Sequence, residues 1–285
     1  MAVDSLTTWR QRLEDAGYVA DETVAAVCHA VERLNRPLLV EGPAGVGKTF
    51  LAKALAQCLN KPLVRLQCYE GLDQAHALYD WNYPKQLLAA RNQEPGQAIQ
   101  SLYDWEFLLE RPLVKAIRLR PSPVLLIDEV ERAGEEFEAM LLEVLGEYQI
   151  TIPEIGTVAA REPPWVVLTS NRSRDLSDAL RRRCLYLWMD YPIVERELAI
   201  IQRHVPSLSW DLAAKVVSAV GKLRAWNLMK PPGLAEAVDW ARLLSDYRAE
   251  DISDTFLRST LSCVLKTRDD WIVVEKQGIR ALWEN

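Results

Sequence analysis

Residues 37–49 read PLLVEGPAGVGKT, a short apolar strand that runs directly into a glycine-rich turn. The turn matches the pattern G-x-x-x-x-G-K-[ST] in full, and a helical pattern follows it over residues 49–59. Glycines leave room for consecutive backbone N–H groups to face inward around phosphate oxygens. The order of strand, turn and helix therefore predicts a phosphate-binding loop in an α/β protein.

The candidate ATP-binding residues are consecutive along this stretch. Lys48 carries a positive charge suited to the outer phosphates, and Thr49 offers a hydroxyl to Mg²⁺, which prefers hard oxygen ligands. A glycine-rich turn that binds no ligand is the alternative, and the flanking strand and helix argue against it. The predicted cofactors are ATP and Mg²⁺, with these ATP-binding residues: Gly42, Pro43, Ala44, Gly45, Val46, Gly47, Lys48, Thr49 and Phe50.

Two adjacent carboxylates, Asp128 and Glu129, follow the apolar residues 124–127. A buried strand that ends in acids places them at the edge where open α/β sheets bind ligands. Neighbouring strand residues point to opposite sides, so Asp128 is expected to hold Mg²⁺ with Thr49, and Glu129 to activate the attacking water. A solvated strand end is the commoner explanation of such a pair, but the phosphate loop in the same chain favours catalysis.

Asn171 follows a second apolar strand, predicted over residues 165–169. Its amide is a candidate to orient the attacking water beside the terminal phosphate. A strand-ending asparagine is more often a turn former, so the assignment depends on the two preceding motifs.

Short apolar strands alternate with helices up to about residue 190, which predicts a parallel sheet covered on both faces. Four helical patterns then follow one another, over residues 194–204, 210–226, 234–247 and 252–266. We expect N-terminal helices over residues 1–36, an α/β nucleotide-binding domain over 37–190 and an all-helical lid domain over 191–285. The α/β domain is expected to carry an insert at about 69–111 and a hairpin at about 149–158.

The composition narrows the class of protein. The 285 residues have a formal net charge of −6 and 49% are hydrophobic, so the chain can bury a core but has no broad basic surface for nucleic acid. No apolar run is long enough to span a membrane. The five cysteines form no C-x-x-C pair and the three histidines are dispersed, so we expect reduced thiols, no metal site built from His or Cys, and a cytoplasmic location.

Taken together, these motifs resemble those of the AAA+ ATPases, a P-loop superfamily, and within them the MoxR group. The loop at 42–49 is similar to a Walker A motif, residues 124–129 to a Walker B motif, and Asn171 to a sensor 1 residue. The hairpin at 149–158 resembles the insertion of the MoxR group. Residues 37–43, 79–88 and 180–184 resemble the CoxD-like branch of that group.

The resemblance implies a function as well as a fold. It implies a Mg²⁺-dependent ATPase that forms a homo-oligomeric ring, usually a hexamer, with ATP bound between subunits. Such an ATPase would remodel or mature a protein client, for example a metalloenzyme such as a molybdenum hydroxylase of the carbon monoxide dehydrogenase kind. It also implies a partner protein with a von Willebrand A domain.

Three consecutive arginines precede the last apolar strand, where AAA+ proteins carry an arginine finger. Arg183 stands at the matching place and Arg182 is the alternative. A guanidinium stays charged and grips phosphate oxygens with two donors, so the expected anion is the γ-phosphate of a neighbouring subunit. For Arg181 we expect a structural role beside nearby acids instead.

The lid lacks one expected residue. Many AAA+ proteins carry a sensor 2 arginine at the start of the third lid helix, but residues 231–237 read PPGLAEA. Arg224 and Arg242 are the candidate replacements. The aromatic residues between 79 and 105 are expected to pack an insert onto the core rather than to grip a substrate.

Two other functions stay open at the level of sequence. The arginine-rich segment 180–184 is also similar to that of DNA-acting AAA+ ATPases of the clamp-loader or branch-migration type, although the negative net charge opposes this function. A slow regulatory nucleotide switch is the other alternative, and the presence of Glu129 and Asn171 opposes it.

Overall fold

The computed structural model describes residues 2–91, 102–247 and 252–283, and the side chains from Leu6 onward. The chain divides into two compact units. The first comprises the residues up to Ala16 together with 20–41 and 49–188, and the second comprises 17–19, 42–48 and the residues from Met189 on. The glycine-rich loop thus belongs to the second unit.

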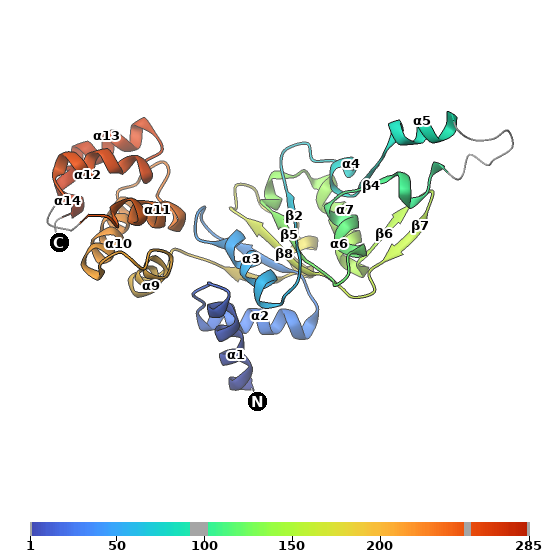
Figure 1. The fold of residues 1–285 in the computed structure, drawn as a ribbon, viewed down its shortest axis with the longest axis horizontal. Coiled ribbons are helices and arrows are strands. Elements are labelled where there is room, and N and C mark those ends of the chain that lie inside the picture. Colours follow the sequence, from blue (N-terminus) through green and yellow to red (C-terminus); the bar gives the residue numbers. More distant parts are fainter. Residues whose placement is uncertain (1, 92–101, 248–251, 284–285) are drawn as a thin grey trace. The chain divides into compact units, whose positions relative to one another are not determined.

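The first unit is built on a five-stranded parallel sheet with the strand order β2-β5-β8-β1-β9. Figure 1 shows these elements along the chain, and their bounds are as follows: α1 Ala2–Asp15, α2 Glu22–Leu34, β1 Leu38–Glu41, α3 Lys48–Cys58, β2 Leu63–Gln67, α4 Gln74–Ala77, β3 Tyr79–Trp81, α5 Tyr83–Arg91, β4 Leu108–Glu110, α6 Pro112–Arg118, β5 Val124–Asp128, α7 Glu135–Glu147, β6 Gln149–Ile152, β7 Gly156–Ala159, β8 Trp165–Ser170, α8 Asp178–Arg183 and β9 Leu185–Trp188.

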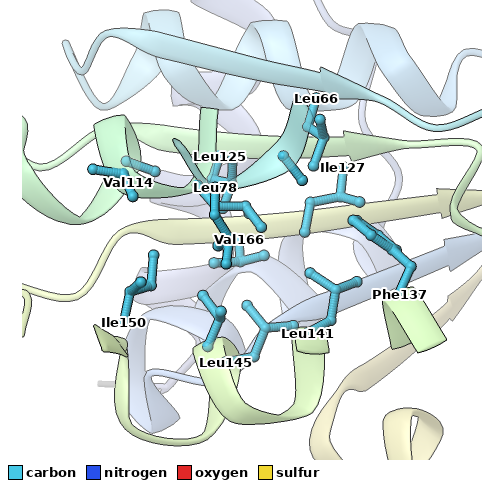
Figure 2. Packing of buried hydrophobic residues seen from close by; sticks show 14 of the residues in the cluster. Leu66, Leu78, Val114, Leu125, Ile127, Phe137, Leu141, Leu145, Ile150 and Val166 are labelled. Atoms are coloured by element: carbon cyan, nitrogen blue, oxygen red, sulfur yellow. The ribbon is translucent and has the colours of Figure 1, made fainter. Parts of the chain in front are cut away.

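Burial explains why the central strands read as continuous apolar runs. All residues of β1 and β5 are buried, which requires cover on both faces of the sheet. On one face, residues of β5 and β8 pack against α6 and α7, and Figure 2 shows this core: Leu125, Ile127, Val166, Val114, Phe137, Leu141 and Leu145. The predicted parallel sheet between helices is confirmed.

The parallel arrangement brings the polar ends of four strands to one end of the sheet. Asp128 pairs in register with Gln67 of β2, and Glu41 of β1 pairs with Ser170 of β8. β2 is an edge strand whose side chains alternate between exposed and buried, so Arg65 and Gln67 lie on its exposed side.

Two small antiparallel pairs accompany the main sheet. β6 and β7 form the predicted hairpin, with Gln149 opposite Ala159. β3 and β4 pair within the expected insert at 69–111, of which residues 92–101 lie outside the described part of the chain. Trp81 is 8% exposed and its ring packs edge-on against Tyr103 at a centroid distance of 5.2 Å, in keeping with a packed insert.

The second unit is helical and has its own core. Its helices are α9 Val194–His204, α10 Trp210–Ala225, α11 Leu234–Leu244, α12 Asp254–Thr260, α13 Arg268–Gln277 and α14 Ile279–Trp283. Trp240 is fully buried at the centre, and its indole N–H donates to the Thr260 hydroxyl over 2.9 Å. No helix among the described residues combines the length and the apolar character needed to cross a membrane.

The helix predicted over 252–266 is wrong in its second half. α12 ends at Thr260 and a 3-10 turn follows over Leu261–Cys263. A new helix begins after Thr267, whose hydroxyl accepts from the Asp270 N–H over 3.1 Å. This cap starts α13 in a polar stretch that lacks the apolar spacing used to predict helices.

Candidate functional site

The glycine-rich loop adopts a backbone that only glycines fit. Gly45 and Gly47 have φ angles of 78° and 99°, in the left-handed region that favours glycine. At Gly42, a Cβ atom would lie 1.9 Å from the carbonyl oxygen of Met189. The three glycines of the motif are therefore required by the conformation itself.

Lys48 is turned into its own loop. Its ammonium donates to the carbonyl oxygens of Gly42 and Pro43 over 2.7 and 2.6 Å, and the residue is 7% exposed. Val46 is buried, whereas Ala44, Gly45 and Phe50 are exposed. The loop thus has little side-chain bulk, and its one cation lies against its own carbonyl oxygens.

The start of α11 lies against this loop within the second unit. The Leu234 N–H donates to the Gly45 carbonyl oxygen over 2.7 Å, and a Cβ on Gly233 would lie 2.6 Å from the Gly45 Cα. Glu236 accepts from the Gly233 N–H over 3.2 Å, closing the first turn of α11. The helix start that lacks a sensor 2 arginine therefore contacts the loop through backbone atoms.

The two candidate replacements for sensor 2 have other partners. Arg224 donates twice to Glu197, at 2.8 Å each, and once to the Pro232 carbonyl oxygen at 2.8 Å. Arg242 is exposed and pairs with Asp239 over 3.1 Å. Arg224 thus anchors the segment before α11.

Asp128 is the centre of a hydrogen-bond network in the first unit. It is 3% exposed, and its Oδ1 accepts from the hydroxyls of Thr49 at 3.0 Å and Thr169 at 2.5 Å. Its Oδ2 accepts from Nε and a terminal nitrogen of Arg65 at 3.1 and 2.6 Å. A buried carboxylate is costly unless it is paired, and here both oxygens have partners.

Thr49 and Asp128 fit the chemistry of a magnesium ion. The hydroxyl oxygen of Thr49 and the carboxylate oxygen of Asp128 are both hard metal ligands. They lie 3.0 Å apart and come from α3 and β5. Mg²⁺ is usually bound through one or two such protein groups, with the remaining ligands supplied by water and substrate phosphates.

Glu129 leaves the strand in an unusual conformation. Its φ and ψ are 56° and 49°, and its backbone N–H donates to the Thr169 hydroxyl over 3.0 Å. The carboxylate accepts from the Gln67 amide at 3.1 Å and from Arg132 at 3.0 Å, and its side chain is 33% exposed. A left-handed residue of this kind is uncommon and is maintained here by its neighbours.

The backbone of Asn171 is fixed by a buried acid. Its N–H donates to Glu131 Oε1 over 2.9 Å, and Glu131 is 3% exposed.

Burial raises the pKa of the nearby Cys68 thiol to about 12, and the carboxylates of Glu131, Asp128 and Glu129 act in the same direction. The strand ends therefore form an acidic environment around a neutral thiol.

The three arginines of α8 have different surroundings. Arg181 donates to both oxygens of the buried Glu41, at 3.0 and 3.2 Å, which supports the structural role expected for it. Arg182 and Arg183 are exposed, and within the described part of the chain the structure gives their side chains no ion pair. Arg36 donates to the main-chain oxygens of Arg182 and Arg183, which fixes the end of this helix.

Sequence reasoning missed three residues around Asp128. Arg65 and Gln67 both lie on the exposed side of the edge strand β2, and Thr169 is the last but one residue of β8. The polar alternation in β2 was a visible signal, but only the strand order shows that it faces the acids of β5.

A family model described as "AAA domain (dynein-related subfamily)" matches residues 37–184, slightly more than half of the chain. The chain belongs to this AAA family. The match begins at β1 and ends after α8, so it contains the loop, the acids of β5, Asn171 and the three arginines.

Individual AAA proteins share about 30% sequence identity with part of this chain. An uncharacterised protein of Staphylococcus haemolyticus is 29% identical over 178 residues, which cover 60% of this chain and 62% of that protein. The chaperone protein ClpB of Rickettsia bellii is 32% identical over 186 residues, which cover 61% of this chain and 20% of ClpB. The chain thus spans less than two thirds of the length of these relatives.

The fold of this AAA protein also occurs among solved structures. A mutant of Thermotoga maritima RuvB has a TM-score of 0.52 and is 18% identical, with 85% of this chain and 69% of that chain covered. At this identity the likeness shows the fold alone, which is a P-loop AAA+ fold with a helical C-terminal region.

Proposed function

We propose that this chain is a Mg²⁺-dependent ATPase of the MoxR type, in its CoxD-like branch, and that it acts on a protein client. The observation that carries the proposal is the meeting of the Thr49 hydroxyl with the buried Asp128 carboxylate, at the strand ends of a P-loop sheet. A hydroxyl beside a carboxylate supplies two of the hard oxygen ligands that Mg²⁺ prefers, next to a phosphate-binding loop.

In this proposal, the loop residues 42–49 hold the triphosphate of ATP. Backbone N–H groups of the loop and the start of α3 donate to phosphate oxygens. Lys48 exchanges its two carbonyl acceptors for the outer phosphates, because an anion is a stronger partner for an ammonium than a neutral carbonyl. Mg²⁺, when bound, supplies charge neutralisation at the phosphates.

Glu129 is the proposed general base. Its carboxylate is partly exposed and can reach water, while its backbone is held by Thr169. Hydrogen bonds from Gln67 and Arg132 orient this carboxylate until a water molecule takes their place. Asn171, fixed through Glu131, is proposed to orient that water.

Arg183 is proposed to act across a subunit interface in a homo-oligomeric ring, with hexamers expected from the MoxR resemblance. An exposed guanidinium with no carboxylate partner in the described residues is suited to an anion supplied by another molecule. Arg182 is the alternative finger. Arg181 is not proposed, because Glu41 already occupies it.

The proposed client is a protein that is remodelled or matured. ClpB proteins, which share part of this chain's sequence, carry the name chaperone. The CoxD-like resemblance favours a metalloenzyme client, such as a molybdenum hydroxylase, and a partner with a von Willebrand A domain.

Subunit mixing tests the proposal. The Lys48→Ala variant should lack nucleotide binding, and the Arg183→Ala variant should bind nucleotide but hydrolyse it poorly. When the two are mixed, some sites combine an intact loop with an intact arginine, so ATPase activity should recover in part. The same mixing is repeated with Arg182→Ala in place of Arg183→Ala. If neither mixture recovers activity at any ratio, an arginine acting between subunits is excluded.

A further inference from the structure

We propose that Arg65 is a positioning residue that holds the Asp128 carboxylate in the absence of metal and releases it when a divalent cation is bound. The inference rests on the proposed function, because it concerns the same magnesium site. It assigns to β2 a role that none of the loop or strand-end motifs contains.

The contact between Arg65 and Asp128 is close and two-pronged. Nε and a terminal nitrogen of the guanidinium both reach Oδ2, at 3.1 and 2.6 Å. The other oxygen, Oδ1, takes its donors from the hydroxyls of Thr49 and Thr169. Arg65 therefore places a positive charge in direct contact with this carboxylate.

Burial makes this charge necessary. The Asp128 side chain is 4% exposed, and an ionised carboxylate in such a position needs a paired charge. The Arg65 side chain is 49% exposed, so its guanidinium can turn into water once a cation takes over the pairing with Asp128. One partner is fixed and the other can leave, which suits a counter-ion that a metal replaces.

The same guanidinium also contacts the proposed base through one intermediate. Arg65 donates to the side-chain oxygen of Gln67, and the Gln67 amide nitrogen donates to Glu129 Oε2 over 3.1 Å. The two β2 residues lie on the same side of the strand, two positions apart. Movement of Arg65 away from Asp128 therefore removes a hydrogen bond that orients Gln67 toward Glu129.

The expected consequence is competition. A divalent cation and the Arg65 guanidinium are both attracted to the Asp128 carboxylate, so removal of the guanidinium should favour the cation. Glutamine is neutral and shorter than arginine, so Arg65→Gln leaves the Asp128 carboxylate open to metal and without its arginine partner when metal is absent.

The test is Mn²⁺ binding to the full chain in the presence of ADP, measured by electron paramagnetic resonance, together with thermal denaturation with and without Mn²⁺. Arg65→Gln should tighten Mn²⁺ binding roughly two- to fivefold, the size expected for an ion pair with one half-exposed partner. It should also lower the metal-free melting temperature. Arg65→Lys should lie between the wild type and Arg65→Gln, because a lysine keeps the charge but not the two-pronged contact.

Arg33→Gln, an exposed arginine of α2, is the matched control and should change neither measurement. Unchanged or weaker Mn²⁺ binding by Arg65→Gln, while the wild type binds Mn²⁺ and ADP normally, would overturn this inference alone. If the wild type itself takes up no Mn²⁺ with ADP, the proposed function fails and the inference fails with it.

Discussion

The hydroxyl of Thr49, in the first turn of α3, donates to the buried carboxylate of Asp128 at the end of β5 over 3.0 Å. The two residues are 79 positions apart, and the strand order brings them together, because α3 follows β1 and both β1 and β5 lie beside β8. Thr169 of the neighbouring strand β8 donates to the same oxygen of Asp128. The proposed magnesium site thus lies at the carboxyl ends of the strands and depends on α3, β5 and β8.

Glu129→Gln should separate binding from hydrolysis. Glutamine keeps the size of the side chain but cannot accept the proton of the attacking water, so ATP hydrolysis should fall roughly 10²- to 10⁴-fold while ATP still binds. Phosphate release and equilibrium ATP binding measure the two effects. Glu136→Gln, an exposed residue of α7, should behave as the wild type, and hydrolysis at the wild-type rate in Glu129→Gln would remove Glu129 from the mechanism.

Thr169→Val should destabilise the first unit. Thr169 is 1% exposed, and its hydroxyl donates to Asp128 and accepts from the Glu129 N–H, so valine leaves two buried polar groups with one partner fewer. The free energy of unfolding should fall by about 1–3 kcal/mol. Urea denaturation provides the measurement. Thr157→Val, on the exposed hairpin, should change stability by less than about 0.5 kcal/mol, and equal effects at the two positions would contradict the network.

Gly233→Ala should disturb the contact between α11 and the loop. The added Cβ would lie 2.6 Å from the Cα of Gly45, where backbone rather than a movable side chain must give way. We expect a loss of about 1–3 kcal/mol in stability and weaker nucleotide binding. Gly221→Ala in α10 meets no atom within 4 Å and should be neutral or stabilising. Full binding and stability in Gly233→Ala would show that this contact is dispensable.

Cys68 should make stability fall at alkaline pH. Burial raises the pKa of its thiol from 9.0 to about 12, so the folded protein binds this proton more tightly than the unfolded chain. The resulting stabilisation is complete below pH 9 and is lost as pH rises toward about 12. Denaturation at pH 8 and pH 10 should show a smaller decrease for Cys68→Ser than for the wild type. The same decrease in both proteins would exclude Cys68 as a source.

Much of the sheet was predictable, because its central strands are continuous apolar runs that end in polar residues. Residues 124–127 predicted β5, and the position of Asp128 followed from its place at the strand end. Periodicity failed where helices are short or polar. α13 begins at a threonine cap in a charged stretch, and no apolar stripe announces it.

The missing parts of the site depend on strand order. Arg65 looks like any exposed residue of an edge strand until β2 is known to lie beside β5, which places it on Asp128. Arg181 and Glu41 are 140 positions apart and meet because β9, which follows α8, pairs with β1. The close approach of Gly45 and Gly233 is a contact between backbone atoms. Sequence patterns carry information about side chains, so they do not predict it.

The central claim is that residues 42–49 bind a magnesium-bound triphosphate. The most direct measurement is isothermal titration of Mg²⁺ and ATP into the full chain. Lys48→Ala is compared with Lys53→Ala, which removes an exposed lysine five positions further along α3. The account predicts saturable binding by the wild type and Lys53→Ala, and none by Lys48→Ala. Equal binding by all three proteins, or no binding by the wild type, would contradict it.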